Sequence, residues 1–263
     1  MIATKVQNKF AELYRYRDMF TGLVSREVRA RYKGSVLGFL WSLLNPLMML
    51  AIYSVVFAVY LRVDIPNYPL FLFAGILPWQ WFTSSLQNGT ATIVSNGNLI
   101  KKVYFPHEIL PVVNVMTNLV NYVFSLPVLV LILLISQVAI TPNLLFLPLL
   151  ILIQFVLTLG IVLILCTANA FFRDVEQLLS PILMAWFYMT PVIYPPSVVP
   201  ERFSFLLYLN PMAPVIAGYQ QIFYLGQSPS LKLLAYSGVL GVVLFVIGYA
   251  IFYNQKFKFS EVV

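Results

Sequence analysis

The chain has 263 residues, of which 60% are hydrophobic and 10% are charged, whereas a soluble domain averages roughly 45–50% apolar and about 25% charged residues. This composition excludes an ordinary soluble protein and indicates a chain that has the lipid bilayer as its solvent. The net charge of +7 does not indicate nucleic-acid binding, because membrane topology and contact with anionic headgroups account for the clustered Lys and Arg residues.

The first 34 residues are predicted to contain an amphipathic helix. Their apolar residues recur at three- and four-residue steps or sums of such steps, with Lys and Arg between them: Ile2, Val6, Phe10, Leu13, Phe20, Val24 and Val28. A helix of this kind lies in the membrane interface, so residues 1–34 are expected to form a cytoplasmic interface and gate region. The N-terminus lacks a signal-peptide pattern, and we expect the first span to be its own insertion signal.

Long uncharged blocks make up most of the remaining chain. Asp, Glu, Lys and Arg are absent from residues 34–61, 65–100, 109–172, 177–200, 203–231 and 233–255. Since a spanning helix needs about 20 apolar residues, the blocks predict one span in 34–61, one at 69–95, two in 109–172, and one each at 176–194 and 231–253. The predicted fold is an all-α integral membrane protein, with a six-helix transmembrane domain at 35–255 and a cytoplasmic tail at 256–263.

Turn residues divide two of these blocks. Thr141-Pro142-Asn143, within residues 137–143, predicts a break between two antiparallel helices. Between the fifth and sixth spans, residues 203–209 and 213–225 are apolar but too short to cross about 30 Å, and Asn210-Pro211 separates them. We expect two re-entrant half-helices within residues 203–225, which pack on the bundle or line a pathway in the outer leaflet.

The Lys and Arg residues predict the orientation, because cytoplasmic loops retain them. Most of them fall on one predicted side: Lys5, Lys9, Arg15, Arg17, Arg26, Arg29, Arg31, Lys33, Lys101, Lys102, Arg173, Lys256 and Lys258. Arg62, Arg202 and Lys232 fall outside this set. Six spans bring both termini to the same side, so both are expected in the cytoplasm.

The connection between the second and third spans is a candidate docking element. Asn96-Gly97-Asn98 ends one span, residues 99–105 can form one or two amphipathic helical turns, and Pro106 is predicted to open the next helix. Such a pattern suits docking into the groove of another protein. The alternative is a solvated loop in which Lys101 and Lys102 only satisfy the orientation rule.

The residue types needed for catalysis are missing. The sequence has no phosphate-binding Gly-x-x-x-x-Gly-Lys-Ser/Thr loop and no clustered carboxylates or metal-spaced His and Cys, so we expect no catalytic residues and no metal site. Adjacent His107 and Glu108 would point about 100° apart on a helix, and Cys166 stands alone. No ionisable residue occupies a predicted mid-membrane position, which favours an external energy source over ion-coupled transport.

Polar and aromatic residues within the spans allow two interpretations each. Asn114, Asn118 and Asn121, with Thr117 nearby, form one polar stripe on the third span, and such a stripe either joins helices or lines a pore. Four aromatic residues either pack or belong to the lipid belt, or offer sugar rings a stacking surface along a channel. These are Tyr53, Phe57, Tyr60 and Trp79.

Several islands of sequence resemble the permease subunits of ABC-type polysaccharide and polyol-phosphate exporters, the family of O-antigen, capsule and teichoic acid exporters. They are RYKGSVLG at 31–38 with Trp41 and NPL at 45–47, NLIKKVYFP at 98–106, FRDV at 172–175, Pro181 through PVIYP at 191–195, and NPM at 210–212. These islands span nearly the whole chain.

The resemblance implies a six-helix subunit that forms a homodimer above two copies of a separate ABC ATPase. That partner would bind ATP and Mg, so this chain is expected to need no cofactor and to have no enzyme activity of its own. A coupling helix that docks on the ATPase would comprise Asn98, Leu99, Ile100, Lys101, Lys102, Val103, Tyr104 and Phe105. ATP binding would push this helix and separate the first and fifth spans to open a polymer channel.

The implied substrate is an undecaprenyl-pyrophosphate-linked polysaccharide or teichoic acid, moved across a bacterial plasma membrane. Arg26, Arg29, Arg31 and Lys33 would hold its pyrophosphate, or else only anchor the chain to lipid. The alternatives are an ABC exporter of drugs or lipids, a scaffold for a polysaccharide synthase that transports nothing, and a passive channel.

Overall fold

The computed structural model describes residues 16–32, 34, 37–60 and 65–263, and this part of the chain is helical and contains no β-strand. Its main helices are α2 (Arg17–Tyr32), α3 (Trp41–Tyr53), the π-helix η2 (Ser54–Tyr60), α4 (Tyr68–Thr90), α5 (Thr92–Ser95), α6 (Gly97–Lys102), α7 (Ile109–Ile135), α8 (Leu147–Phe171), α9 (Asp174–Met189), α10 (Ser204–Leu209), α11 (Met212–Gln220), the π-helix η6 (Gln221–Leu225), α12 (Leu231–Gln255) and α13 (Phe259–Val262). The predicted all-α class is confirmed.

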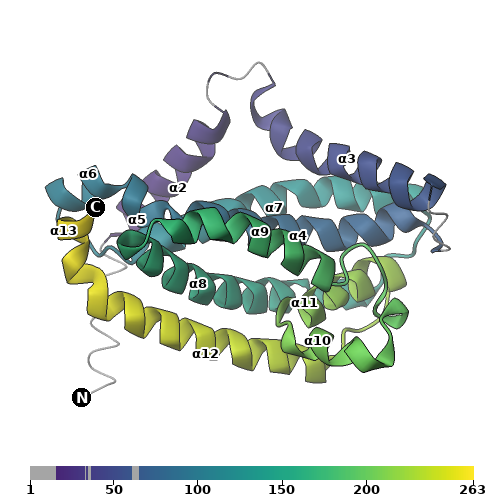
Figure 1. Cartoon of the computed structure of the whole chain (residues 1–263). Coiled ribbons are helices and arrows are strands. Elements are labelled where there is room, and N and C mark those ends of the chain that lie inside the picture. The colour runs from purple at the N-terminus through teal and green to yellow at the C-terminus, as the bar shows by residue number, and fades with distance from the viewer. Residues whose placement is uncertain (1–15, 33, 35–36, 61–64) are drawn as a thin grey trace.

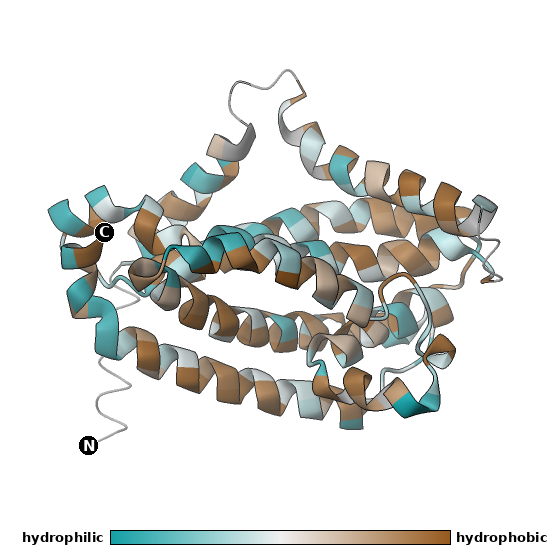
Figure 2. Cartoon of the chain, viewed as in Figure 1, coloured by the Kyte–Doolittle hydropathy of each residue, from teal (hydrophilic) through white to brown (hydrophobic). Residues whose placement is uncertain are grey.

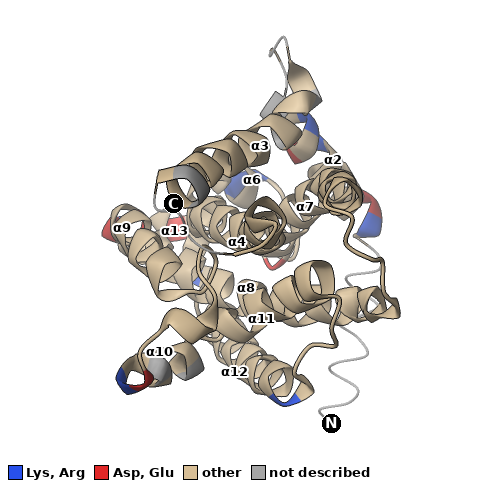
Figure 3. Ribbon diagram, turned by 90° about the vertical axis from the view of Figure 1, so that its right-hand side faces the viewer, with Lys and Arg blue, Asp and Glu red and all other residues tan. Residues whose placement is uncertain are grey.

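The long helices form one elongated bundle. In Figure 1, α4, α7, α8, α9 and α12 run lengthwise, α2 and α3 slope over one side, and α10 and α11 lie at the end opposite α6 and the C-terminus. Colouring by hydropathy shows apolar residues along most of α8 and α12, and hydrophilic residues gathered around α6 and the C-terminal segment (Figure 2). Viewed along its length, the bundle carries charges mainly at the helix ends (Figure 3).

Three helices of the described chain are long and apolar enough to cross a membrane. They are Ile109–Ile135, Pro142–Phe171 and Leu231–Val262, and they coincide with the predicted third, fourth and sixth spans. Helices lie at the other three predicted positions: α3 continued by η2, α4, and the shorter α9. The number of crossings stays a prediction.

Several predicted boundaries agree with the structure and others do not. The break at residues 137–143 is found, where Gln137 takes a positive φ of 55° and Pro142 starts the 3-10 helix η3 (Pro142–Phe146). The fifth helix was predicted to reach Tyr194, which is wrong: α9 ends at Met189 and Thr190 is extended. The reason is Pro191, because a proline disfavours the helical conformation of the residue before it.

The third long helix also starts later than expected. Pro106 was predicted to open it, but α7 begins at Ile109. Residues 107 and 108 form a turn in which the amide of Ile109 donates to the carbonyl of Pro106 over 3.0 Å. Proline can occupy a first turn but does not require the helix to begin there.

The core of the bundle is centred on α4. This helix packs against α7, α8, α9 and α11, and it is buried on nearly every side. Two hydrogen bonds join it to neighbouring helices: Trp81 Nε1 donates to the carbonyl of Val115 over 3.4 Å, and Gln154 Nε2 donates to the carbonyl of Pro78 over 2.8 Å. Helix α4 therefore fixes the positions of the elements that surround it.

Glycines allow α8 and α12 to approach closely. A Cβ atom added to Gly160 would lie 2.5 Å from the backbone nitrogen of Phe245, and one added to Gly248 would collide with the carbonyl oxygen of Gly160. Small residues at such contacts let two backbones pack directly, which is a main source of helix association in membranes.

Asn210 joins the ends of α9, α10 and α11. Its Oδ1 accepts a hydrogen bond from Trp186 Nε1 over 2.8 Å and another from the backbone amide of Met212 over 3.0 Å. Its Nδ2 donates to Thr190 Oγ1 over 2.8 Å. The structure thus has two short helical segments on either side of Asn210-Pro211, as predicted; that they re-enter the outer leaflet remains a prediction.

Replacing Gly160 with alanine is expected to lower stability by about 1–3 kcal/mol, because backbone atoms of α12 must move to admit the methyl group. The measurement is thermal unfolding of the purified protein in detergent. Gly238→Ala is the matched control, since the nearest atom to its added Cβ is 3.8 Å away. Equal unfolding midpoints for the two variants would contradict the tight contact.

Replacing Asn210 with leucine is expected to cost about 2–4 kcal/mol, because the partly buried Trp186 indole N–H loses its acceptor and the amide of Met212 and the buried Thr190 hydroxyl each lose a hydrogen bond. Unfolding in detergent would measure the loss, and a change in tryptophan emission would report on Trp186. Gln227, which is exposed on a loop, provides the control Gln227→Leu. An Asn210→Leu variant as stable as this control would show that the hydrogen bonds contribute little.

Candidate functional site

The connection after α5 forms a short amphipathic helix. Ile100 and, beyond the helix end, Phe105 are buried, whereas Lys101 and Lys102 are exposed and Tyr104 is 95% exposed. The helix α6 ends at Lys102 because Val103 is extended, with φ −127° and ψ 131°. The predicted segment 98–105 is therefore helical only in its first part, and it presents cations and an aromatic ring outward.

The C-terminal segment supports this connection from behind, a feature that the sequence analysis did not predict. Phe259 is fully buried, and its ring centroid lies 6.4 Å from that of His107 and 5.2 Å from that of Phe252. The backbone of Val263 passes so close to Gly97 that an added Cβ would lie 3.4 Å from its carbonyl carbon. In the sequence, the only feature that distinguishes Phe259 is that it is an aromatic residue in the tail after the last predicted span.

One ion pair joins the start of the third long helix to this segment. Lys256 Nζ lies 2.8 Å from Glu108 Oε1, with both side chains largely buried. Burial lowers the pKa of the neighbouring His107 below its ordinary value, although the carboxylate of Glu108 acts in the opposite direction. The lowered pKa favours the neutral imidazole, and the carboxylate of Glu108 is paired with the ammonium group of Lys256.

A polar cavity opens beside α6, between α2, the α4–α5 junction, α7 and α9. Its volume is about 680 Å³, and Glu27, Gln87, Asn114, Glu176 and Gln177 are among the residues that line it. We call it the polar mouth. Thr117 Oγ1 donates to Glu27 Oε2 over 3.4 Å, so that one wall, α2, is tied to α7.

A second cavity, of about 710 Å³, is lined by residues of α3, α4 and α7. Asn118 and Asn121 of α7 line it opposite Gln80 and Ser84 of α4. Thr117 therefore joins α7 to α2, and the asparagines line cavities of the single chain; that the stripe lines a pore stays a prediction.

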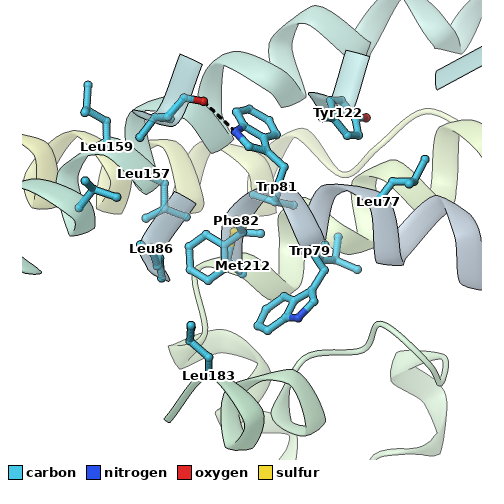
Figure 4. Close-up of a cluster of buried hydrophobic side chains, with 14 of the residues drawn as sticks. Leu77, Trp79, Trp81, Phe82, Leu86, Tyr122, Leu157, Leu159, Leu183 and Met212 are labelled. Atoms are coloured by element: carbon cyan, nitrogen blue, oxygen red, sulfur yellow. Dashed lines mark hydrogen bonds between the residues drawn. The ribbon is translucent and has the colours of Figure 1, made fainter. Parts of the chain in front are cut away.

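The four aromatic candidates divide in two. Tyr53, Phe57 and Trp79 belong to one cluster, in which the rings of Tyr53 and Trp79 lie 6.0 Å and 5.7 Å from that of Phe187 on α9. Figure 4 shows Trp79 beside Phe82 and near Leu183. Tyr60 is separate and 75% exposed. Within a single chain Trp79 is buried, so its part in a channel stays a prediction.

The four cationic candidates are only partly described. Arg26 and Arg29 lie on α2 with exposed side chains. The side chain of Arg31 and the whole of Lys33 fall outside the described residues. Their proposed role is therefore supported only by the exposed arginines of α2.

Truncating Phe259 to alanine is expected to loosen α6, because the ring that fills the space beneath residues 105–107 is lost. Limited trypsin digestion of the purified protein would then cut faster after Lys101 and Lys102. Phe257→Ala is the control, since Phe257 is 73% exposed. Equal cutting rates for both variants would show that the C-terminal segment does not support α6.

The comparisons with known proteins agree on one family. Residues 19–224 match the family model described as "ABC-2 type transporter". The chain is 40% identical to the O-antigen export system permease protein RfbA of Myxococcus xanthus, over 95% of this chain and 97% of that protein. It is 36% identical to a protein of the same name from Klebsiella pneumoniae, over 93% of this chain and 95% of that protein.

A more distant relative is the polysialic acid transport protein KpsM of Escherichia coli, 26% identical over 89% of this chain and 92% of that protein. These relatives confirm the resemblance that the sequence islands indicated. The chain belongs to the ABC-2 type transporter family, and it is similar over nearly its whole length to the permease subunits of polysaccharide exporters.

Proposed function

We propose that this chain is the transmembrane subunit of an ATP-driven exporter that carries a lipid-linked cell-envelope polysaccharide to the outer side of the bacterial plasma membrane. The observation that carries the proposal is the 40% identity to an O-antigen export permease over 95% of the chain. Similarity to a polysialic acid transport protein also favours a carbohydrate over a drug or a lipid, the alternative cargo for this helix plan.

The proposed energy source is a separate ABC ATPase, two copies of which bind ATP and Mg beneath a dimer of this chain. The long uncharged blocks offer no mid-membrane ionisable group for ion coupling. The outward-facing Lys101, Lys102 and Tyr104 give α6 and the residues after it the character of a docking surface. Because Phe105 and Ile100 are buried in the bundle, a push on α6 is transmitted to the start of α7.

The proposed polymer channel lies between the two subunits, next to α3 and α9. Both helices have exposed apolar residues in the single chain, among them Met48 and Ile52 on α3 and Ile182 and Met184 on α9. A second copy across a two-fold axis would cover such faces, since an isologous interface uses the same surface on both subunits. The aromatic cluster around Phe187 lies behind this surface.

The proposed recognition of the undecaprenyl-pyrophosphate group uses the cations of α2 and the residues that follow. Guanidinium groups bind phosphate oxygens in bidentate fashion, and Arg26 and Arg29 are exposed. Anchoring to anionic lipid is the competing role. A variant that combines Arg29→Ala with Arg31→Ala separates the two, because unchanged export at normal expression and assembly would leave only lipid anchoring.

Association with the candidate ATP-binding subunit is the test of the proposed function. Lys101→Glu with Lys102→Glu is expected to lower copurification of that subunit, and its stimulated ATPase activity in lipid, by about tenfold or more, because two cations at the docking surface are reversed. The matched control is Arg202→Glu with Lys232→Glu, which makes the same charge change at exposed positions near the opposite end of the bundle.

The outcomes separate the alternatives. Loss of association in the first variant alone supports docking through α6. Loss in both variants would indicate a general effect of charge on assembly. A wild-type chain that associates with no such ATPase but copurifies with a glycosyltransferase would reject the transporter and favour a scaffold for polysaccharide synthesis.

A further inference from the structure

A small cavity opens between residues 103–108 and the C-terminal segment, residues 256–263. Tyr104, Phe257 and Ser260 are among the residues that line it, and we call it the tail cavity. Its volume is about 320 Å³, at the lower end of the roughly 300–1,000 Å³ that is typical of ligand pockets. A cavity of this size suits a side chain of a partner better than a large ligand.

Two aromatic rings in the lining of the tail cavity are turned toward solvent. Tyr104 is 95% exposed and Phe257 is 73% exposed. Both residues lie beyond the long uncharged blocks of the sequence, where hydrophilic residues gather around α6 and the C-terminal segment (Figure 2). Aromatic residues are enriched at protein interfaces and often act as their anchors. Their polar surroundings therefore favour a protein partner over the lipid core.

The charged residues that line the tail cavity, Lys256 and Glu108, are paired with each other. Their Nζ and Oε1 atoms lie 2.8 Å apart. The same ammonium group lies 4.3 Å from the ring centroid of Tyr253 and 5.4 Å from that of Phe257, and such rings attract a cation. An apolar side chain can therefore enter beside the rings without leaving the ammonium group buried and uncompensated.

The surface around the tail cavity carries exposed cations. Lys101 and Lys102 lie on α6, and Lys258 lies on the C-terminal segment, all with exposed side chains. Glu261 is an exposed carboxylate of the same segment, so lysines outnumber acidic side chains on this surface. Charges of opposite sign across an interface steer association and fix its register. The matching partner therefore carries carboxylates around its apolar anchor.

Helix α6 and the C-terminal segment form one structural unit. Helix α13 packs against α6, and Val263 lies against Gly97. The fully buried ring of Phe259 lies 6.3 Å from that of Phe171 at the end of α8. Because these contacts hold the two segments side by side, a partner that docks on α6 also meets the C-terminal segment.

We propose that α6, residues 103–105 and the C-terminal segment form one composite docking surface for the ATPase subunit, and that the tail cavity receives an apolar side chain of that subunit. The inference rests on the proposed function and deepens it, since the sequence indicated docking only at residues 98–105. The C-terminal segment then has two separate roles: Phe259 holds α6 in place, and Phe257 contacts the partner.

Substitutions in the lining test the proposal on the full chain in nanodiscs with neutral lipids. Phe257→Ala is expected to weaken binding of the purified ATPase subunit about tenfold, because an interface anchor is lost. Ser260→Trp is expected to weaken it at least as much, because the indole occupies the tail cavity. Biolayer interferometry measures Kd. The matched controls Phe205→Ala and Ser228→Trp, at exposed positions near the opposite end of the bundle, should change Kd by less than about threefold.

Two further measurements separate direct contact from a structural effect. In the absence of the ATPase subunit, trypsin should cut Phe257→Ala after Lys101 and Lys102 at the unaltered rate, in contrast to Phe259→Ala. A photoreactive benzoylphenylalanine at position 257 should crosslink to the ATPase subunit, whereas the same group at position 205 should not. If Ser260→Trp disturbs α6, the Phe257 variant and the crosslink decide the question.

Several outcomes would overturn the inference. Unchanged affinity of the Phe257→Ala variant would do so, as would the lack of a crosslink from position 257 in a complex that forms. A bound lipid or a dimer fraction that changes with Phe257→Ala, at constant ATPase affinity, would assign the tail cavity to lipid or to a second copy of this chain.

Failure of the inference is distinguishable from failure of the proposed function. If the unaltered chain binds the ATPase subunit and Lys101→Glu with Lys102→Glu abolishes binding, but both cavity variants bind normally, the exporter stands and the composite surface falls. If the unaltered chain binds no such subunit, the proposed function and the composite surface fall together.

Discussion

The structure depends on one constraint, the need to satisfy polar groups without water. Where the helices break, side chains supply the missing hydrogen bonds. After α9, Gln220 Nε2 donates to the carbonyls of Pro191 and Val192 over 3.1 and 3.3 Å, and the Tyr68 hydroxyl donates to the carbonyl of Ile193 over 3.0 Å. These bonds fix the irregular segment between α9 and α10 onto α4 and α11.

Patterns that depend on local physics could be predicted from the sequence. Uncharged blocks indicated where the long helices lie, and Thr141-Pro142 and Asn210-Pro211 marked two breaks, because charge, length and proline act independently of distant partners. The ends of α9 and α6 lie earlier than predicted: α9 stops before Thr190, which precedes Pro191, and α6 stops before Val103, which is extended. The support from Phe259 could not be predicted, because only the folded chain brings residues 259 and 107 together.

The candidate site shows the same division. The segment 98–105 was identified from its pattern and its motif, and its exposed and buried faces follow that pattern. The asparagine stripe left two roles open, because a stripe on one helix does not reveal its neighbour. The structure shows that α4 is that neighbour and carries a matching polar row. Residues of both helices line the two cavities. The sequence analysis did not identify Glu27 as a site residue, because a single acidic residue between Arg26 and Arg29 forms no recognisable motif.

The two walls of the polar mouth differ in how firmly they are held. Helix α4 is buried on nearly all sides, whereas in α2, among the residues whose side chains the structure describes, Leu23 alone is buried. The contact of α2 with α7 includes the long 3.4 Å bond from Thr117 to Glu27. Segments with few buried apolar contacts open at low free-energy cost. Displacement of α2 is therefore expected to cost less free energy than displacement of α4.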